Sequence, residues 1–177
     1  MMEAIWEAVR QDLPGPGDLG GAAQATVRLV LAALLGGVIG YERGMLGRPA
    51  GMRTYMLVAL GSAFFVVAPL QAGMHLADLS RVLQGILTGI GFLGTGAILK
   101  LEGREQVRGL TTAAGIWLTS GLGMAAGLGR LGLAVVGAAL GLGIITALRR
   151  LEQKVDEARR GGGPDPASSE ITTDQVR

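Results

Sequence analysis

The most constraining feature of this sequence is a series of long stretches without a charged residue. Four of them hold 18 to 24 residues each, at 54–77, 82–99, 109–129 and 131–148. A fifth, Leu19 to Tyr41, is interrupted only by Arg28. A helix needs about 20 mostly apolar residues to cross the hydrocarbon core of a bilayer. The sequence therefore predicts five membrane-spanning helices, at about residues 22–41, 54–71, 82–99, 109–128 and 131–149.

The composition favours an all-α, polytopic membrane bundle over a water-soluble domain. Charged residues make up 17% of the chain and glycine supplies 31 of its 177 residues, against typical shares of about 25% and 7%. The net charge of +2 does not indicate nucleic-acid binding. The chain has no cysteine, its one histidine is His75, and Asp78 is the only carboxylate between Thr54 and Leu101. We therefore predict no catalytic residues, no bound cofactor, no metal site and no nucleic-acid partner.

The basic residues lie in segments between the predicted spans. Three segments carry most of them: Arg43, Arg48 and Arg53; Lys100, Arg104 and Arg108; and Arg149, Arg150, Lys154, Arg159 and Arg160. The opposite connections carry only Arg81 and Arg130. Lys and Arg concentrate in the cytoplasmic loops of membrane proteins, and the three basic segments share one side of a five-helix path. The sequence therefore predicts an outside N-terminus and a cytoplasmic C-terminus.

The two ends of the chain differ from the spans. Residues 1–18 form a polar leader that begins with the pattern of a short interfacial helix. Residues 19–150 form the predicted five-helix transmembrane domain. Residues 151–177 form a charged cytoplasmic tail, of which the last 17 are expected to be disordered because they contain too few apolar residues to pack.

Glycine recurs at four-residue steps in the predicted helices, which places small residues on one face. The glycines expected to pack helices are Gly36, Gly40, Gly85, Gly89, Gly91, Gly94, Gly96, Gly123 and Gly127. Packing within the chain and a homo-oligomer seam are both open interpretations. The segment 89–94 matches G-x-G-x-x-G, but it lies within an apolar stretch and lacks the preceding strand that a dinucleotide site needs. Its dense glycines indicate either close packing or a broken helix.

Polar residues within or beside the spans are the candidates for a functional site. They are Arg28, Glu42, Arg43, Arg53, Asp78, Gln84, Arg108, Thr111 and Thr112. We interpret Glu42, Arg43 and Arg53 as a charge-assisted network that fixes the first helical hairpin. Snorkelling anchors in the headgroup region are the alternative, and a binding role is the third interpretation. Arg28 falls in the outer half of the first span, where a charged group faces the bundle interior or snorkels outward. Asp78 and Arg81 are candidate neighbours of Arg28.

Three motifs resemble those of the MgtC/SapB family. The first is Leu34–Arg43 followed by Arg48–Thr54, the second is Gln84 with Gly89–Gly96, and the third is Val107–Ala114. Their order and spacing fit the family over roughly residues 25–150. The residues that match the motifs and carry over as functional candidates are Glu42, Arg43, Arg53, Gln84, Arg108 and Thr112.

The resemblance implies a multi-pass protein of the bacterial inner membrane, linked to growth in low magnesium and to virulence inside macrophages. It further implies a regulator rather than a magnesium carrier, with the F-type ATP synthase as a proposed target. Long members of the family carry a soluble C-terminal domain, whereas this chain resembles the short, SapB-type form.

Two functions fit these observations. The first is a regulatory protein that contacts other membrane proteins through its small-residue helix faces. The alternative is a transporter or channel for magnesium, another ion or a small solute. A broken third helix, the intramembrane Arg28 and the hydroxyl-rich fourth helix with Thr111 and Thr112 favour it. In either case we expect the chain to lie in the lipid bilayer as a homo-oligomer, with a dimer as the simplest form.

Overall fold

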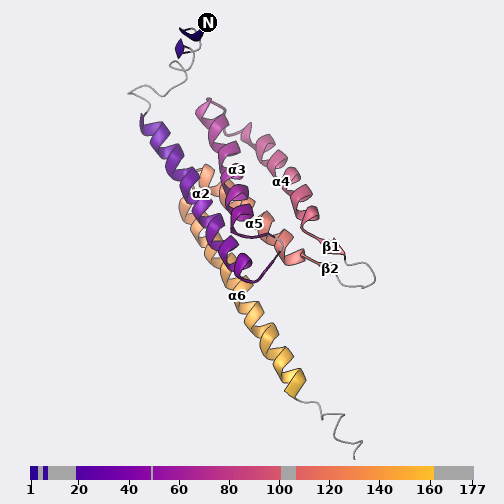
Figure 1. The fold of residues 1–177 in the computed structure, drawn as a ribbon. Coiled ribbons are helices and arrows are strands. Elements are labelled where there is room, and N and C mark those ends of the chain that lie inside the picture. The colour runs from indigo at the N-terminus through magenta and orange to yellow at the C-terminus, as the bar shows by residue number, and fades with distance from the viewer. Residues whose placement is uncertain (4–5, 8–18, 49, 101–106, 162–177) are drawn as a thin grey trace, which may run out of the picture. The chain divides into compact units, whose positions relative to one another are not determined.

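The computed structural model describes residues 1–177 apart from 4–5, 8–18, 49, 101–106 and 162–177. In this part of the chain the helices are α2 (Leu19–Met45), α3 (Met52–Gln71), α4 (Leu79–Gly96), α5 (Leu110–Gly127) and α6 (Leu131–Gly161), as Figure 1 shows. Two short antiparallel strands, β1 (Leu99–Lys100) and β2 (Val107–Arg108), connect α4 to α5. The all-α prediction is confirmed, with a strand pair that the sequence did not predict. Most of the predicted leader, and the tail from residue 162 on, lie outside the described residues.

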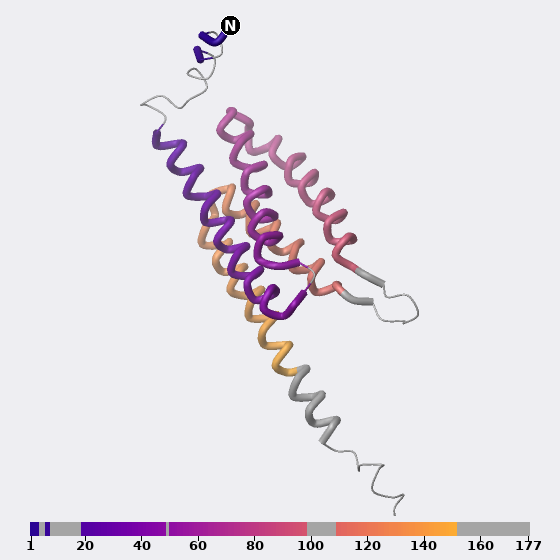
Figure 2. The backbone as a smooth tube through the Cα atoms, viewed as in Figure 1, coloured from indigo at the N-terminus to yellow at the C-terminus, as the bar shows by residue number. Residues whose placement is uncertain are grey.

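The chain divides into two units, Met1–Gly141 and Leu142–Arg177. In the first unit, α2, α3 and α5 pack against one another, whereas α4 packs along α5 and contacts α3 much less (Figure 2). The centre of this unit consists of fully buried alanines from four helices, Ala32, Ala59, Ala63, Ala126 and Ala134. Such small side chains let helix backbones approach closely, which favours helix association in lipid. The second unit is the later part of α6, where Thr146 donates a hydrogen bond to the Leu142 carbonyl at 2.7 Å.

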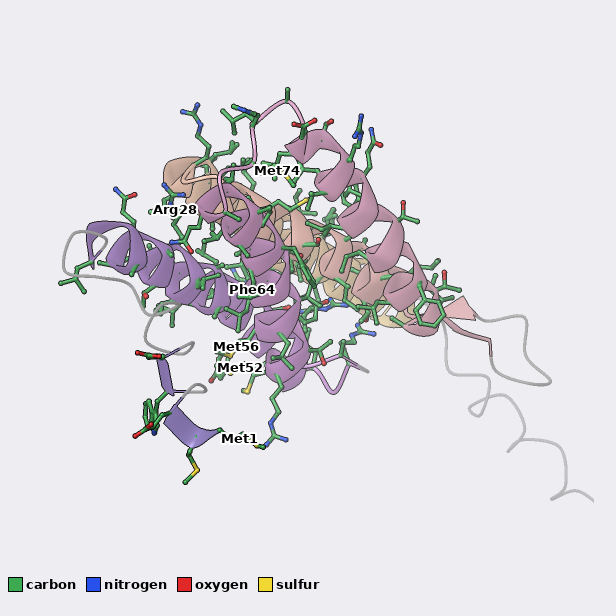
Figure 3. The ribbon with its side chains drawn as sticks, turned by 90° about the horizontal axis from the view of Figure 1, so that it is seen from above. Met1, Arg28, Met52, Met56, Phe64 and Met74 are labelled. Carbon is green, nitrogen blue, oxygen red and sulfur yellow. The ribbon has the colours of Figure 1, made fainter. Side chains whose placement is uncertain are left out.

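Glycines of α2 determine how closely α3 can approach. A Cβ atom at Gly36 would lie 2.5 Å from the carbonyl oxygen of Tyr55, and one at Gly40 would lie 2.7 Å from the Cα of Met52. Gly37 faces the side chain of Met56, which follows Met52 along α3 (Figure 3). Because the first two contacts are with backbone atoms, a side chain at either glycine would push the two helices apart.

Glycines of α5 make the same kind of contact on another side of α3. A Cβ atom at Gly123 would overlap the carbonyl oxygen of Ala59, and one at Gly127 would lie 2.8 Å from the carbonyl oxygen of Ala63. The backbone of α3 is therefore held between glycine faces of α2 and α5.

The glycines of α4 differ from those of α2 and α5. Four of them, at positions 85, 89, 91 and 96, have no atom of another element within 4 Å of an ideal Cβ, and the Cβ of Gly94 would lie at an ordinary 3.8 Å from Ala113. Within the described chain these four glycines make no close helix contact, so a contact with another molecule stays a prediction. The helix is also continuous from Leu79 to Gly96. The broken-helix interpretation is therefore wrong, because each of these glycines keeps the backbone hydrogen bonding of the helix.

The junction between α4 and α5 depends on Gly109. Its φ angle is 98°, in the left-handed region that glycine occupies without strain. A side chain at this position would also overlap the carbonyl oxygen of Ala97, just beyond the end of α4. Gly109 thus allows the start of α5 to contact the end of α4.

Three helices are long and apolar enough to cross a membrane, namely α2, α3 and the part of α6 from Leu131 to Leu151, among the residues that the structure describes. The other two, α4 and α5, have 18 residues each, a length of about 27 Å. Their polar residues, Arg81 and Gln84 among them, and their glycines lower the mean hydropathy. Large apolar side chains face outward, with Leu34 at 54%, Phe92 at 82% and Leu140 at 64% exposure. An apolar surface of this extent suits hydrocarbon better than water.

Three of the predicted spans differ from the structure by three or more residues at one or both ends. The first, 22–41, is α2 at Leu19–Met45, and the third, 82–99, is α4 at Leu79–Gly96. The fifth, predicted to end at 149, continues in α6 to Gly161. The prediction placed helix ends at the charged residues Arg81 and Arg149. Charged residues of good helix propensity continue a helix readily once it leaves the apolar region, so charge marks the edge of a span better than the end of a helix.

Candidate functional site

A buried polar cluster lies where α2 ends and where α3 and α5 begin. It contains Arg43 at 3%, Tyr55 at 0% and Thr112 at 1% exposure. Each residue comes from a different helix, and glycines of α2 and α5 pack against Tyr55. The Gly40 backbone packs on the Tyr55 side chain, and a Cβ at Gly115 would lie 2.5 Å from the Tyr55 hydroxyl oxygen.

Thr112 is the centre of this cluster. The Arg43 guanidinium donates from Nη2 to the Thr112 hydroxyl at 3.1 Å, and the Tyr55 hydroxyl donates to the Thr112 carbonyl at 3.2 Å. Glu42 precedes Arg43 directly in the chain. Both carboxylate oxygens of Glu42 are buried. The cluster therefore connects three helix ends through one threonine.

The cluster can hold α2, α3 and α5 together at this end of the bundle, and it contains the buried positive charge of Arg43. The Arg43 Nε is buried and has no hydrogen-bond partner among the described residues. A buried guanidinium is costly unless it is paired and hydrogen-bonded. The hydrogen bonds of the cluster join helices.

The predicted network at this end of the bundle forms only in part. Arg43 is buried in the cluster, as a network residue should be, and Glu42 lies beside it. Arg53 is exposed and lines a groove between α3 and α4 instead. Tyr55 was not predicted, although a tyrosine one turn into an apolar span is a usable signal, because its hydroxyl needs a partner when the ring is buried.

A second polar contact lies deeper between α3 and α5. The hydroxyls of Ser62 and Ser120 are 2.8 Å apart and hydrogen-bonded, and both residues are buried. Thr119 is fully buried, and its hydroxyl has no hydrogen-bond partner among the described residues. Thr112, Thr119 and Ser120 therefore form a line of buried hydroxyls along one side of α5.

Arg28 lies toward the opposite end of the bundle from the buried cluster. It extends from α2 (Figure 3) and donates from Nη1 to the carbonyl oxygen of Gly127 at 3.2 Å. A Cβ at Gly129, whose φ is 77°, would lie 2.9 Å from the Arg28 Nη2. The guanidinium therefore caps the C-terminal end of α5, where carbonyls lack helical partners and the helix dipole favours a cation. The expected neighbour, Asp78, forms no ion pair within the described chain.

The outward face of α4 carries a polar and small-residue stripe, Gln84, Thr88, Gly91 and Thr95. All four are exposed, and their spacing of four, three and four residues places them on one helix face. The two threonine hydroxyls donate to carbonyls of their own helix, each at 2.9 Å. We call this surface the α4 stripe.

The other predicted site residues lie apart from these contacts. Thr111 is exposed, next to the buried Thr112, and Asp78 is exposed at the start of α4, where it lines a small pocket with Arg81. The side chain of Arg108, in β2, lies outside the described part of the structure.

The apolar helices, the glycine contacts between their backbones and the buried polar cluster define a helical membrane protein. The sequence pattern of the MgtC family matches residues 29–154. The chain belongs to the MgtC family, as the sequence motifs indicated.

The chain is also similar to individual proteins over most of its length. The chain is 47% identical to Protein SrpB of Synechococcus elongatus, over 71% of its own length and 75% of the relative's. It is 38% identical to the Putative magnesium transporter YhiD of Escherichia coli K12, over 73% of the chain and 62% of YhiD. It is 42% identical to Protein MgtC of Brucella abortus, over 81% of the chain and 60% of that protein. No solved structure matches the chain.

Proposed function

We propose that the protein is a regulator in the bacterial inner membrane that acts by helix contact with another membrane protein. The observation that carries this proposal is the α4 stripe. Gln84 presents an amide outward from a bundle whose other outward side chains are largely apolar. A polar side chain in hydrocarbon favours a hydrogen-bonding partner, and small residues let a second helix approach closely.

The attachment of α4 supports the same proposal. It contacts α5 more than α3, so its outward face remains open to a partner while its contacts with α5 hold it in the bundle. The glycine faces of α2 and α5, in contrast, are already occupied by α3. The face of α4 that carries Gly91 is uncovered in the described part of the chain, since nothing lies within 4 Å of an ideal Cβ at that position.

The proposed placement has five spans, with the N-terminus outside and the C-terminus in the cytoplasm. The contacts of Thr112 with Arg43 and Tyr55 bring the connections that follow α2 and precede α5 to one end of the bundle. Both connections are basic in sequence, as cytoplasmic loops are. We propose that α4 and α5 span the membrane with the other helices, and that the chain forms a homo-oligomer in the bilayer.

The family resemblance supplies the partner to test, the membrane sector of the F-type ATP synthase, under magnesium limitation. A photo-crosslinking amino acid at position 91 or 95 of the α4 stripe, in cells grown at low magnesium, should yield adducts with a membrane-sector subunit. Position 34 on α2, which is also exposed, is the matched control. Adducts only between copies of this chain, or equal adducts from position 34, would refute the regulatory contact.

A transport function is the second candidate. Two observations favour it: a relative carries the name putative magnesium transporter, and buried hydroxyls follow α5 into the bundle. The buried cation of Arg43 lies at one end of that line, however, and repels a divalent cation. If the protein is a regulator, proteoliposomes that contain it should show no magnesium uptake when uptake is measured with an internal indicator. Uptake that Thr112→Val abolishes would favour the transporter.

A further inference from the structure

A groove of about 730 Å³ runs between α3 and α4. It exists because α4 packs on α5 and stands off from α3, and because glycines at positions 61, 85 and 89 present no side chain to fill it. The groove lies on a different face of α4 from the α4 stripe, since Gly91 and Thr95 are not among its lining residues. Its occupant therefore does not depend on the partner proposed above.

The wall of the groove is apolar along most of its length. Leu57, Phe65, Ile86 and Leu93 are among the lining side chains. The one hydroxyl in its middle, that of Ser62, is already hydrogen-bonded to Ser120 at 2.8 Å. The groove thus suits a hydrocarbon chain and offers little to a polar solute.

The length of the groove matches one leaflet of a bilayer. From Arg53 to Phe65 the α3 wall covers 12 helical steps, which corresponds to about 18 Å. Half of a hydrocarbon core of roughly 30 Å is about 15 Å. A groove that begins at the end of a span therefore reaches to about the middle of the membrane.

The elongated shape of the groove suits an acyl chain as the occupant. A single extended acyl chain is much thinner than an α-helix, which is about 10 Å or more in diameter with its side chains. Such a chain can lie along the apolar wall between α3 and α4.

One end of the groove is positively charged. Arg53 lines it, is exposed, and forms no side-chain hydrogen bond within the described chain. Arg53 is the second residue of α3, and the preceding Gly51 provides no side-chain cap. The first N–H groups of a helix lack helical partners and favour a phosphate. The charged end and the apolar wall are complementary to an amphiphile with an anionic head.

We propose that the groove between α3 and α4 binds one acyl chain of an anionic phospholipid of the inner leaflet, with the headgroup phosphate at Arg53 and the start of α3. The apolar wall selects a lipid over a polar solute, and Arg53 selects an anionic over a zwitterionic headgroup. Such a lipid would fill the space that α3 and α4 leave between them.

The test uses the full chain in nanodiscs of equal parts phosphatidylglycerol and phosphatidylcholine, released into native mass spectrometry. We expect phosphatidylglycerol to be retained over phosphatidylcholine, with one molecule per protomer. Arg53→Gln should weaken retention about fivefold, the loss expected for one basic residue at a membrane surface. Gly89→Leu should abolish retention by filling the groove, and it should not disturb the fold because nothing lies within 4 Å of that position.

Two matched variants separate this site from general lipid contact. Arg48→Gln removes an exposed arginine of the same connection that does not line the groove, and Gly91→Leu adds the same side chain on another face of α4. Both should retain lipid as the unmodified chain does. The proposal would be overturned if Arg48→Gln lost as much bound lipid as Arg53→Gln, or if Gly91→Leu lost as much as Gly89→Leu. Equal retention of phosphatidylglycerol and phosphatidylcholine by the unmodified chain would also overturn it. A dimer that Gly89→Leu splits, with no lipid retained by the unmodified chain, would show that a second copy fills the groove.

Discussion

Replacement of Gly123 by alanine tests whether glycine contacts hold the bundle together. A Cβ at this position would overlap the carbonyl oxygen of Ala59 and would lie 3.0 Å from the Ala59 Cα. Both are backbone atoms of α3, so no flexible side chain can move aside. The methyl group can be accommodated only if α5 moves away from α3.

The expected cost follows from two opposing effects. Overpacking of a tight contact costs about 1–3 kcal/mol, and the hydrogen bond between Ser62 and Ser120, at 2.8 Å, lies in the interface that would open. Alanine regains up to about 1 kcal/mol through its higher helix propensity. We therefore expect Gly123→Ala to lower the free energy of unfolding by about 1–2 kcal/mol, which for a chain of this size corresponds to a Tm lower by about 2–8 °C.

Gly121 provides the control in the same helix. A Cβ there meets no atom within 4 Å, so Gly121→Ala gains helix propensity without a clash and should raise the free energy of unfolding by up to about 1 kcal/mol. Thermal unfolding of both variants would be followed in one detergent by loss of the monodisperse peak in size-exclusion chromatography. If Gly123→Ala were as stable as Gly121→Ala, backbone contact between α3 and α5 could not be what limits the approach of these helices.

Three further outcomes are expected. Arg43→Gln should lower the free energy of unfolding by about 1.5–3 kcal/mol, because a hydrogen bond to a charged group is lost; equal loss for the exposed Arg48→Gln in a denaturant titration would contradict this. A double-mutant cycle of Ser62→Ala and Ser120→Ala should give a coupling of about 0.6 kcal/mol, and additive effects would show that their hydrogen bond contributes nothing. Gly129→Ala should lower the Tm by a few degrees, since its φ of 77° is strained for alanine, and an unchanged Tm would exclude that strain.

The helices were predictable because they depend on features local in sequence. Uncharged stretches of 18 or more residues located four of the five described helices, and a stretch interrupted only by Arg28 located the fifth. The four-residue glycine steps at Gly36 and Gly123 indicated close packing. The sequence could not show which glycines face a partner within the chain. Gly85 and Gly89 are four residues apart, as Gly36 and Gly40 are. Only Gly36 and Gly40 lie close to another helix.

The polar cluster was predictable only in part. Glu42 and Arg43 were recognisable as charges at the end of a span, but nothing local distinguishes Arg43, at 3% exposure, from the exposed Arg53. That difference depends on the direction in which each side chain leaves its helix relative to α5. The central role of Thr112, and the exposure of its neighbour Thr111, likewise depend on how α5 is rotated about its axis in the bundle.

The unequal surroundings of the glycines affect how sequences of this family should be compared. At Gly36, Gly40, Gly123 and Gly127, invariance among relatives would follow from the geometry of one folded chain, and it would give no information about activity. At Gly91 the fold itself would tolerate a larger residue, so invariance there would have to originate outside the protomer. A ranking of family positions by variability alone would mix these two causes of invariance. Positions should first be sorted by whether an added methyl group would clash within the folded chain. Invariant glycines without such a clash are then the candidates for contact with a partner.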